Sequence, residues 1–196
     1  MALETGNEEF RKNVLNKNVT NENLINATEL FKKYKIKHSI AMMLGLPGET
    51  IEYALETLDF YIQISNKYTI PAVNIFKPYP KLKITEYGVK IGQYDESFIV
   101  DENMIGDTVM NFYDCLRKDE IGRNIINLSR LSYFYIKFPY LRNIIKNKLI
   151  YLNDSMIFKF IYSFSQAFFQ LRHHVNSSWL TLFKISIKHW NKNIRA

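Results

Sequence analysis

The clearest hydrophobic pattern is a continuous apolar run at residues 40–44, which ends in a glycine–proline–glycine turn. Such a run is too short for a helix and is typical of a parallel strand buried on both faces. Gly45 and Gly48 can adopt backbone angles that other residues avoid, and Pro47 stiffens the turn between them. From Thr50 onward apolar residues recur at helical spacing, which predicts a helix with Thr50 as its N-cap. A strand, a glycine turn and a helix in this order place backbone N–H groups where α/β proteins bind ligands.

Two more strand patterns flank this unit. Residues 1–4 have the pattern of a strand end, and a helical pattern follows at residues 8–15. A third strand is expected at residues 70–76, and Pro78 and Pro80, which follow it, bar a helix there. Strands that alternate with helices predict βα units, an α/β fold and about three parallel strands. A helix capped by Thr20 is expected to turn five residues inward: Leu24, Ala27, Thr28, Phe31 and Tyr34.

Charge divides the chain unevenly. Residues 1–130 carry 16 Lys and Arg against 18 Asp and Glu, whereas residues 131–196 carry 10 Lys and Arg against Asp154 alone. The last third also holds 15 of the 29 aromatic residues. We therefore expect an α/β region at 1–92, a connecting helical region at 93–130, and a basic, aromatic-rich helical tail at 131–196.

The composition excludes several kinds of site and location. The single cysteine, Cys115, excludes an internal disulfide framework and a cysteine-cluster metal site made by this chain alone. His173 and His174 are adjacent in sequence and do not share one helix face, so we expect no metal site there. The sequence has neither a charged-then-apolar leader nor a run of 18 apolar residues, so a cytoplasmic protein is expected.

Three stretches, taken together, resemble the radical S-adenosylmethionine (SAM) superfamily, in particular its cobalamin-binding type. They are ALETGNEEFRKNVLNKNVT at 2–20, MMLGLPGETIEYALETLDF at 42–60 and VNIFKPYPKLKITEYG at 73–88. Their order, with each stretch at a strand end, is more specific than any one of them. The resemblance implies that residues 1–92 are the C-terminal half of a radical SAM barrel, a partial (β/α) barrel followed by an all-helical C-terminal region.

The resemblance also implies a set of SAM-binding residues. Glu4 would face the ribose or the methionyl part, and Lys17 stands where the family has an arginine that pairs with the SAM carboxylate; a lysine lacks that planar grip. Glu49 is expected to be a charge at the helix start and not a ligand contact. Each position also has a purely structural explanation. Glu4 would be a solvated acid, Lys17 a surface lysine, residues 45–48 a tight turn between strand and helix, and residues 76–80 an exit loop. The full set is Glu4, Lys17, Gly45, Leu46, Pro47, Gly48, Phe76 and Pro78.

The family's cofactors are SAM, a [4Fe–4S] cluster and, in this type, cobalamin. The CxxxCxxC cluster loop is missing from the sequence, and the lone Cys115 cannot replace it. We therefore expect the chain alone to bind no cluster and to be inactive, with Met1 an internal methionine of a longer protein. Its expected partners are the missing N-terminal half of the barrel and a cobalamin domain.

Two alternatives remain open. The chain is either a short protein that completes a split enzyme or has lost activity, or a non-enzymatic module. In the second case the basic aromatic tail docks on an anionic membrane surface or on a partner helix, which makes the protein a peripheral membrane protein. Nucleic-acid binding is not expected, because the basic residues lie among bulky apolar ones and form no recognised motif.

Overall fold

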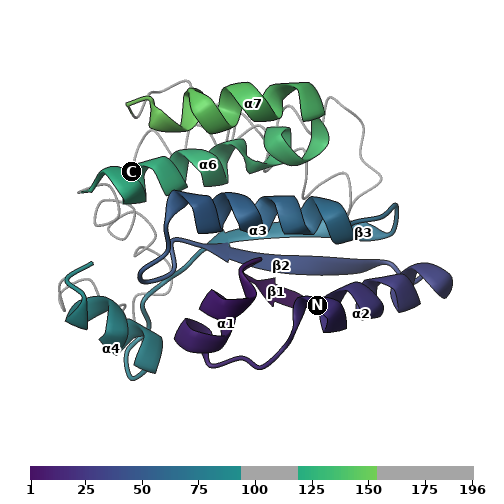
Figure 1. The fold of residues 1–196 in the computed structure, drawn as a ribbon, viewed down its shortest axis with the longest axis horizontal. Helices are drawn as coiled ribbons and strands as arrows, with labels where there is room; N and C mark the ends of the chain where they lie inside the picture. Colours follow the sequence, from purple (N-terminus) through teal and green to yellow (C-terminus); the bar gives the residue numbers. More distant parts are fainter. Residues whose placement is uncertain (94–118, 154–196) are drawn as a thin grey trace, which may run out of the picture.

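The computed structural model describes residues 1–93 and 119–153, which form one three-stranded parallel sheet with helices (Figure 1). The strands lie in the order β1–β2–β3. The predicted α/β class and the three parallel strands are confirmed, and the arrangement matches a partial (β/α) barrel. The elements are β1 (Ala2–Glu4), α1 (Glu8–Leu15), α2 (Asn21–Lys33), β2 (His38–Leu44), α3 (Ile51–Ile64), β3 (Thr69–Ile75), α4 (Lys83–Lys90), α6 (Glu120–Lys137), α7 (Pro139–Asn147) and a 3-10 helix (Leu149–Tyr151).

The register of the sheet is regular on one side and shifted on the other. β2 and β3 pair without interruption from His38 opposite Thr69 to Leu44 opposite Ile75. Between β1 and β2 the register shifts, and Glu4 has a left-handed backbone with φ 63°. A non-glycine residue in this region is uncommon, and it turns the chain sharply out of β1. β1 therefore ends at Glu4, the residue whose side chain is expected in the site.

The helix caps form where the sequence predicts them. Thr20 accepts a hydrogen bond from the Asn23 backbone N–H at 3.1 Å, and Thr50 accepts one from the Tyr53 N–H at 3.3 Å. One predicted inward residue is wrong, because Tyr34 is 66% exposed. The reason is that α2 ends at Lys33, so Tyr34 is its C-cap and has left the apolar face.

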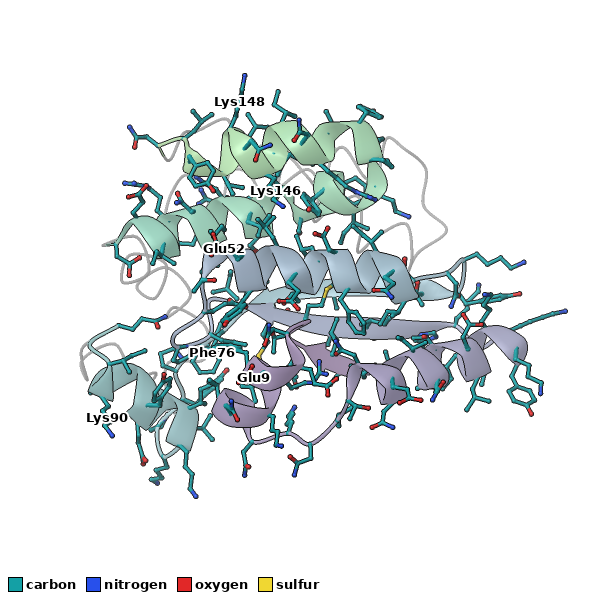
Figure 2. All side chains as sticks on the ribbon, in the orientation of Figure 1. Glu9, Glu52, Phe76, Lys90, Lys146 and Lys148 are labelled. Carbon is teal, nitrogen blue, oxygen red and sulfur yellow. The ribbon has the colours of Figure 1, made fainter. Side chains whose placement is uncertain are left out.

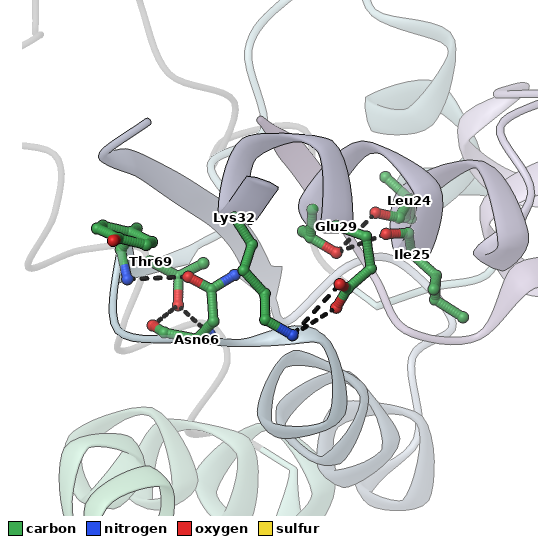
Figure 3. A network of polar contacts seen from close by, with 8 residues as sticks. Leu24, Ile25, Glu29, Lys32, Asn66 and Thr69 are labelled. Atoms are coloured by element: carbon green, nitrogen blue, oxygen red, sulfur yellow. Dashed lines mark hydrogen bonds and ion pairs between the residues drawn. The ribbon is translucent and has the colours of Figure 1, made fainter. Parts of the chain in front are cut away.

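The α3–β3 connection is closed by local polar contacts at the amino end of β3 (Figure 3). The Asn66 backbone N–H donates to the Thr69 hydroxyl at 2.9 Å, and that hydroxyl donates to the Asn66 carbonyl at 2.7 Å. Figure 3 also shows an exposed ion pair between Lys32 and Glu29 on α2. These contacts lie at the end of the sheet opposite to the glycine turn.

Helices α3, α6 and α7 stack in succession, with α6 in contact with both α3 and β3 (Figure 1). The Tyr135 hydroxyl on α6 donates to the Asp59 carboxylate on α3 at 2.8 Å. Arg142 on α7 donates to the Tyr135 carbonyl at 2.9 Å. Residue 130 lies inside α6, so the change in charge along the chain does not coincide with the end of an element.

The buried hydrophobic residues form two clusters. The larger one joins the sheet to α2, α3, α6 and α7, and the smaller one lies at the carboxyl end of the sheet. The smaller cluster contains Phe10, Leu46, Phe76 and Ile126. Of the helices described in residues 1–93 and 119–153, none is long and apolar enough to span a membrane.

Candidate functional site

The carboxyl ends of the three strands meet at one edge of the sheet, and seven of the eight predicted residues lie at or just after those ends. Glu4 ends β1, and the glycine turn follows β2. Phe76 follows β3 and is labelled in Figure 2. The eighth residue, Lys17, reaches this edge from the loop after α1. In α/β proteins ligands bind at this end of a parallel sheet, so this edge is the candidate site.

Glu4 and Lys17 contact each other directly. The Lys17 ammonium donates to Glu4 Oε1 at 2.5 Å, and the two side chains are 44% and 14% exposed. Lys17 is brought back over β1 because Asn16, the C-cap of α1, has a left-handed backbone with φ 52°. Two residues that were expected to contact different parts of SAM therefore form an ion pair in the structure.

The turn between β1 and α1 is built against α3. The Gly6 backbone N–H donates to the Thr57 hydroxyl at 2.9 Å, and the Thr5 and Thr57 hydroxyls are 3.2 Å apart. A Cβ atom on Gly6 would lie 2.7 Å from the Glu56 carbonyl oxygen and from the Thr57 Cα. The glycine in the TGNE stretch is therefore required by close packing on a neighbouring helix.

Arg11 holds the loop that carries Lys17. Its buried guanidinium donates to the Thr5 carbonyl at 2.6 Å, to the Val19 carbonyl at 2.9 Å and to the Asn21 side-chain oxygen at 2.6 Å. Burial lowers the pKa of Arg11, and the nearby Glu8 carboxylate opposes this effect. Arg11 is not among the predicted site residues, although it stands three and four positions before Val14 and Leu15 and so shares their helix face.

The glycine turn adopts the backbone that its sequence favours. Gly45 and Gly48 have φ values of 79° and 77°, in the left-handed region that glycine enters without strain. Gly45, Leu46 and Pro47 are buried, and Gly48 is exposed. The Tyr87 hydroxyl of α4 would lie 3.3 Å from a Cβ atom on Gly48, so α4 packs beside this turn.

Glu49 differs most from its expected place. Its side chain is 5% exposed and folds back into the turn, where Oε2 accepts hydrogen bonds from the Gly45 N–H at 2.5 Å and the Leu46 N–H at 3.3 Å. Burial raises the pKa of Glu49 to about 8, against the two N–H groups, which lower it. Glu49 is therefore part of the turn and not a solvated charge at the helix start. The sequence signal for this is an acid one position before the N-cap, close to the apolar run at residues 40–44.

Phe76 and Pro78 are both buried at the end of β3. Phe76 shares the smaller hydrophobic cluster with Leu46 from the glycine turn, Phe10 from α1 and Ile126 from α6. The structure thus brings Leu46 and Phe76 together, next to the strand end that carries Glu4. The contribution of Ile126 could not be read from the sequence, because it lies 50 residues beyond Phe76 along the chain.

Among the described residues, the side chains at the strand ends have the chemistry that a ligand such as SAM requires, and they offer no set of ligands for an iron–sulfur cluster. A charged pair at one strand end and an apolar cluster at the next match a ligand with a zwitterionic amino acid part and a flat aromatic ring. Within residues 1–93 and 119–153, no three His, Cys, Asp or Glu side chains are grouped so as to hold a metal ion. Cys115, His173 and His174 lie outside the described residues.

Comparison with known proteins gives one family and one relative. Residues 1–61 match the family profile of the radical SAM superfamily. An uncharacterized protein of Methanocaldococcus jannaschii is 30% identical over 94 residues, which are 48% of this chain and 18% of that protein. The chain thus covers less than a fifth of the length of this relative. Residues 1–61, from β1 through the glycine turn into α3, are therefore similar to the radical SAM superfamily.

Proposed function

We propose that residues 1–93 are the SAM-binding half of the core of a radical SAM enzyme of the cobalamin-binding type. The observation that carries this proposal is the pairing of Glu4 and Lys17 at the end of β1, beside the glycine turn that ends β2. Both features lie in the segment that matches the superfamily. The cobalamin-binding type rests on the resemblance of the three sequence stretches.

The side chains at the strand ends supply complementary contacts to SAM. The Glu4 carboxylate can accept hydrogen bonds from both vicinal ribose hydroxyls, and the Lys17 ammonium can pair with the SAM carboxylate. Their ion pair holds both groups at the end of β1 before SAM binds. The adenine ring would lie against the turn from Gly45 to Gly48 and the end of β3 at Phe76 and Pro78. SAM binding would therefore replace part of the Glu4–Lys17 contact with contacts from each side chain to the cofactor.

The reductive chemistry belongs to cofactors that this chain does not hold by itself. In this superfamily a [4Fe–4S] cluster with cysteine ligands supplies the electron that cleaves SAM. The chain contains one cysteine, so the cluster ligands have to come from elsewhere in the enzyme. We expect the isolated chain to lack the absorbance of iron–sulfur clusters, which lies at about 400 nm. We also expect it to form no 5′-deoxyadenosine.

The partner that completes the site is proposed to pair with β1. Among the described residues β1 pairs with β2 alone, so its other edge has no strand partner there. An unpaired strand edge is a template for another strand. The missing N-terminal half of the barrel, supplied by the same longer protein or by a separate chain in a split enzyme, would bind at this edge and bring the cluster and cobalamin.

Isothermal titration of the full 196-residue chain with SAM tests the proposed function, with methionine and adenosine as partial ligands. We expect SAM to bind more tightly than either part, because it uses the Glu4–Lys17 pair and the glycine turn at once. A chain that binds SAM no better than adenosine would contradict the role of Glu4 and Lys17. The absence of any binding would contradict the proposal as a whole.

A second proposed function rests on the charge of the tail. Residues 131–196 carry 10 Lys and Arg against a single acid, together with 15 aromatic residues. Such a composition suits docking on an anionic membrane surface, where each cation adds about 1 kcal/mol. Co-sedimentation of the chain with anionic and neutral vesicles at low and high salt tests it. Binding that ignores lipid charge and salt would reject this function.

A further inference from the structure

Each backbone N–H group from Gly45 to Glu49 has an internal partner. The Gly45 and Leu46 N–H groups donate to Glu49 Oε2, at 2.5 and 3.3 Å. The Gly48 N–H donates to the Gln93 side-chain oxygen at 2.8 Å, and the Glu49 N–H donates to the Leu46 carbonyl at 2.9 Å. Pro47 has no N–H group. The sequence predicted N–H groups that face a ligand here, and the structure instead uses them within the chain.

The Glu49 carboxyl occupies the position at which phosphate-binding turns hold an anion. In those turns a strand ends in a glycine loop that opens a helix, and the free N–H groups of the loop receive a phosphate oxygen. Here the order of elements is the same, β2, glycine turn and α3, but a carboxyl oxygen of the chain itself receives the two N–H groups. The two N–H groups that would receive a phosphate oxygen are thus occupied by the chain itself.

The segment that carries the turn also gives no support to an anion, and the cation at this edge, Lys17, is paired with Glu4. Residues 38–66, which include β2, the turn and α3, contain no Lys or Arg. Glu52 lies exposed in the first turn of α3, where a phosphate would approach the helix (Figure 2). An external phosphate would therefore meet a second acid and would have to displace Glu49, which is buried.

We propose that Glu49 is the residue by which the Gly45–Gly48 turn selects a nucleoside without phosphate and rejects nucleotides. The proposal rests on the proposed function in that SAM is such a nucleoside, and it adds a reason why the site takes SAM and not a nucleoside phosphate. Glu49 acts by holding the turn and is a positioning and specificity residue, because its carboxyl is buried and bound to the backbone. The effect does not depend on protonation, since Oε2 can accept both N–H groups in either state.

The test compares the full chain with its E49A, E49Q and E52A variants. Adenosine, AMP and inorganic phosphate are titrated against each, with isothermal titration and phosphorus NMR as readouts. We expect wild type and E49Q to bind AMP no more tightly than adenosine, because a carboxamide oxygen still accepts the two N–H groups. We expect E49A to gain about tenfold or more in affinity for AMP and phosphate, because two N–H groups become free. E52A is the matched control: it removes an exposed acid at the same helix end without freeing the turn, so we expect it to gain clearly less affinity for AMP and phosphate than E49A.

Amide hydrogen exchange in the wild-type chain provides a measurement that requires no variant to fold. We expect the Gly45 and Leu46 amides to be protected, and to remain protected in E49Q. Rapid exchange of both amides in an otherwise protected wild-type chain would overturn the proposal, as would AMP binding by wild type more tightly than adenosine. An E49A chain that folds and gains no phosphate affinity would overturn it too. If wild type binds no adenosine or SAM, the proposed function fails, while the phosphate and exchange results still decide the role of Glu49.

Discussion

The Lys17 ammonium and the Glu4 carboxylate form an ion pair at the carboxyl end of β1, although α1 separates them along the chain. Because Lys17 is 44% exposed, the pair adds less than about 1 kcal/mol to stability. Its importance lies in orientation, since it holds a cation and an acceptor beside the glycine turn. The proposed function therefore depends on the position of these two charged groups.

Replacing Lys17 with methionine should weaken SAM binding by roughly tenfold while changing the free energy of unfolding by less than about 1 kcal/mol. The reason is that the variant removes the charge for the SAM carboxylate and keeps the length of the side chain. Titration with SAM and urea unfolding measure the two effects. Lys12→Met is the matched control, because Lys12 is exposed on the preceding helix. Equal loss of affinity in both variants would show that Lys17 has no specific role.

Replacing Arg11 with methionine should destabilise the chain by about 3 kcal/mol. The variant leaves the Thr5 and Val19 carbonyls and the Asn21 side-chain oxygen without their buried donor. The loop that carries Lys17 should loosen, so SAM affinity should fall along with stability. Urea unfolding at neutral pH measures the first effect. A loss within about 0.5 kcal/mol, as for an ordinary surface substitution, would contradict the structure of this loop.

Gly6→Ala should cost about 2 kcal/mol or more, because its Cβ would lie 2.7 Å from the backbone of α3 and force the two elements apart. Gly92→Ala is a useful contrast. Gly92 has φ 71° but no atom within 4 Å of its Cβ position, so only backbone strain of about 1 kcal/mol is expected. Thermal unfolding of both variants separates crowding from strain. A smaller loss for Gly6→Ala than for Gly92→Ala would contradict the packing of this turn on α3.

Glu49 should make stability depend on pH in an unusual direction. Between pH 4.5 and about 8 the folded chain keeps the proton on Glu49 and the unfolded chain does not. The contribution of Glu49 to the free energy of unfolding should therefore fall as pH rises through this window, by about 5 kcal/mol at most. E49Q removes this titration, so its stability relative to wild type should rise from pH 5 to pH 8. A constant difference between the two across that range would contradict the buried, protonated carboxyl.

Local signals in the sequence were sufficient to predict the strands, the caps at Thr20 and Thr50, and the glycine turn. These features depend on a few neighbouring residues and on backbone angles that only some residues adopt. The same signals placed Tyr34 inward, because helical spacing does not show that α2 ends one residue earlier. The resemblance to the radical SAM superfamily assigned Glu4 and Lys17 to the same ligand, without showing that the two side chains pair.

The remaining features depend on contacts between distant parts of the chain. Arg11 turns inward because the carbonyls of Thr5 and Val19 converge on it, and this convergence exists only after folding. The Glu49 carboxyl is buried away from solvent, so the Gly45 and Leu46 N–H groups are its hydrogen-bond donors. Ile126 joins Phe76 across a long sequence separation. Which polar side chains become buried depends on contacts between distant segments, and hydrophobic periodicity does not describe such contacts.

The most direct test of the central claim is to locate SAM on the isotope-labelled full chain by NMR, with SAM added up to millimolar concentration. We expect the shifts to move at Glu4, Lys17 and Gly48, together with the end of β3 at Phe76, and to leave the opposite end of the sheet at Asn66 and Thr69 unchanged. Shifts that move mainly at Asn66 and Thr69, or no shift at all, would contradict a SAM site at the carboxyl ends of these strands.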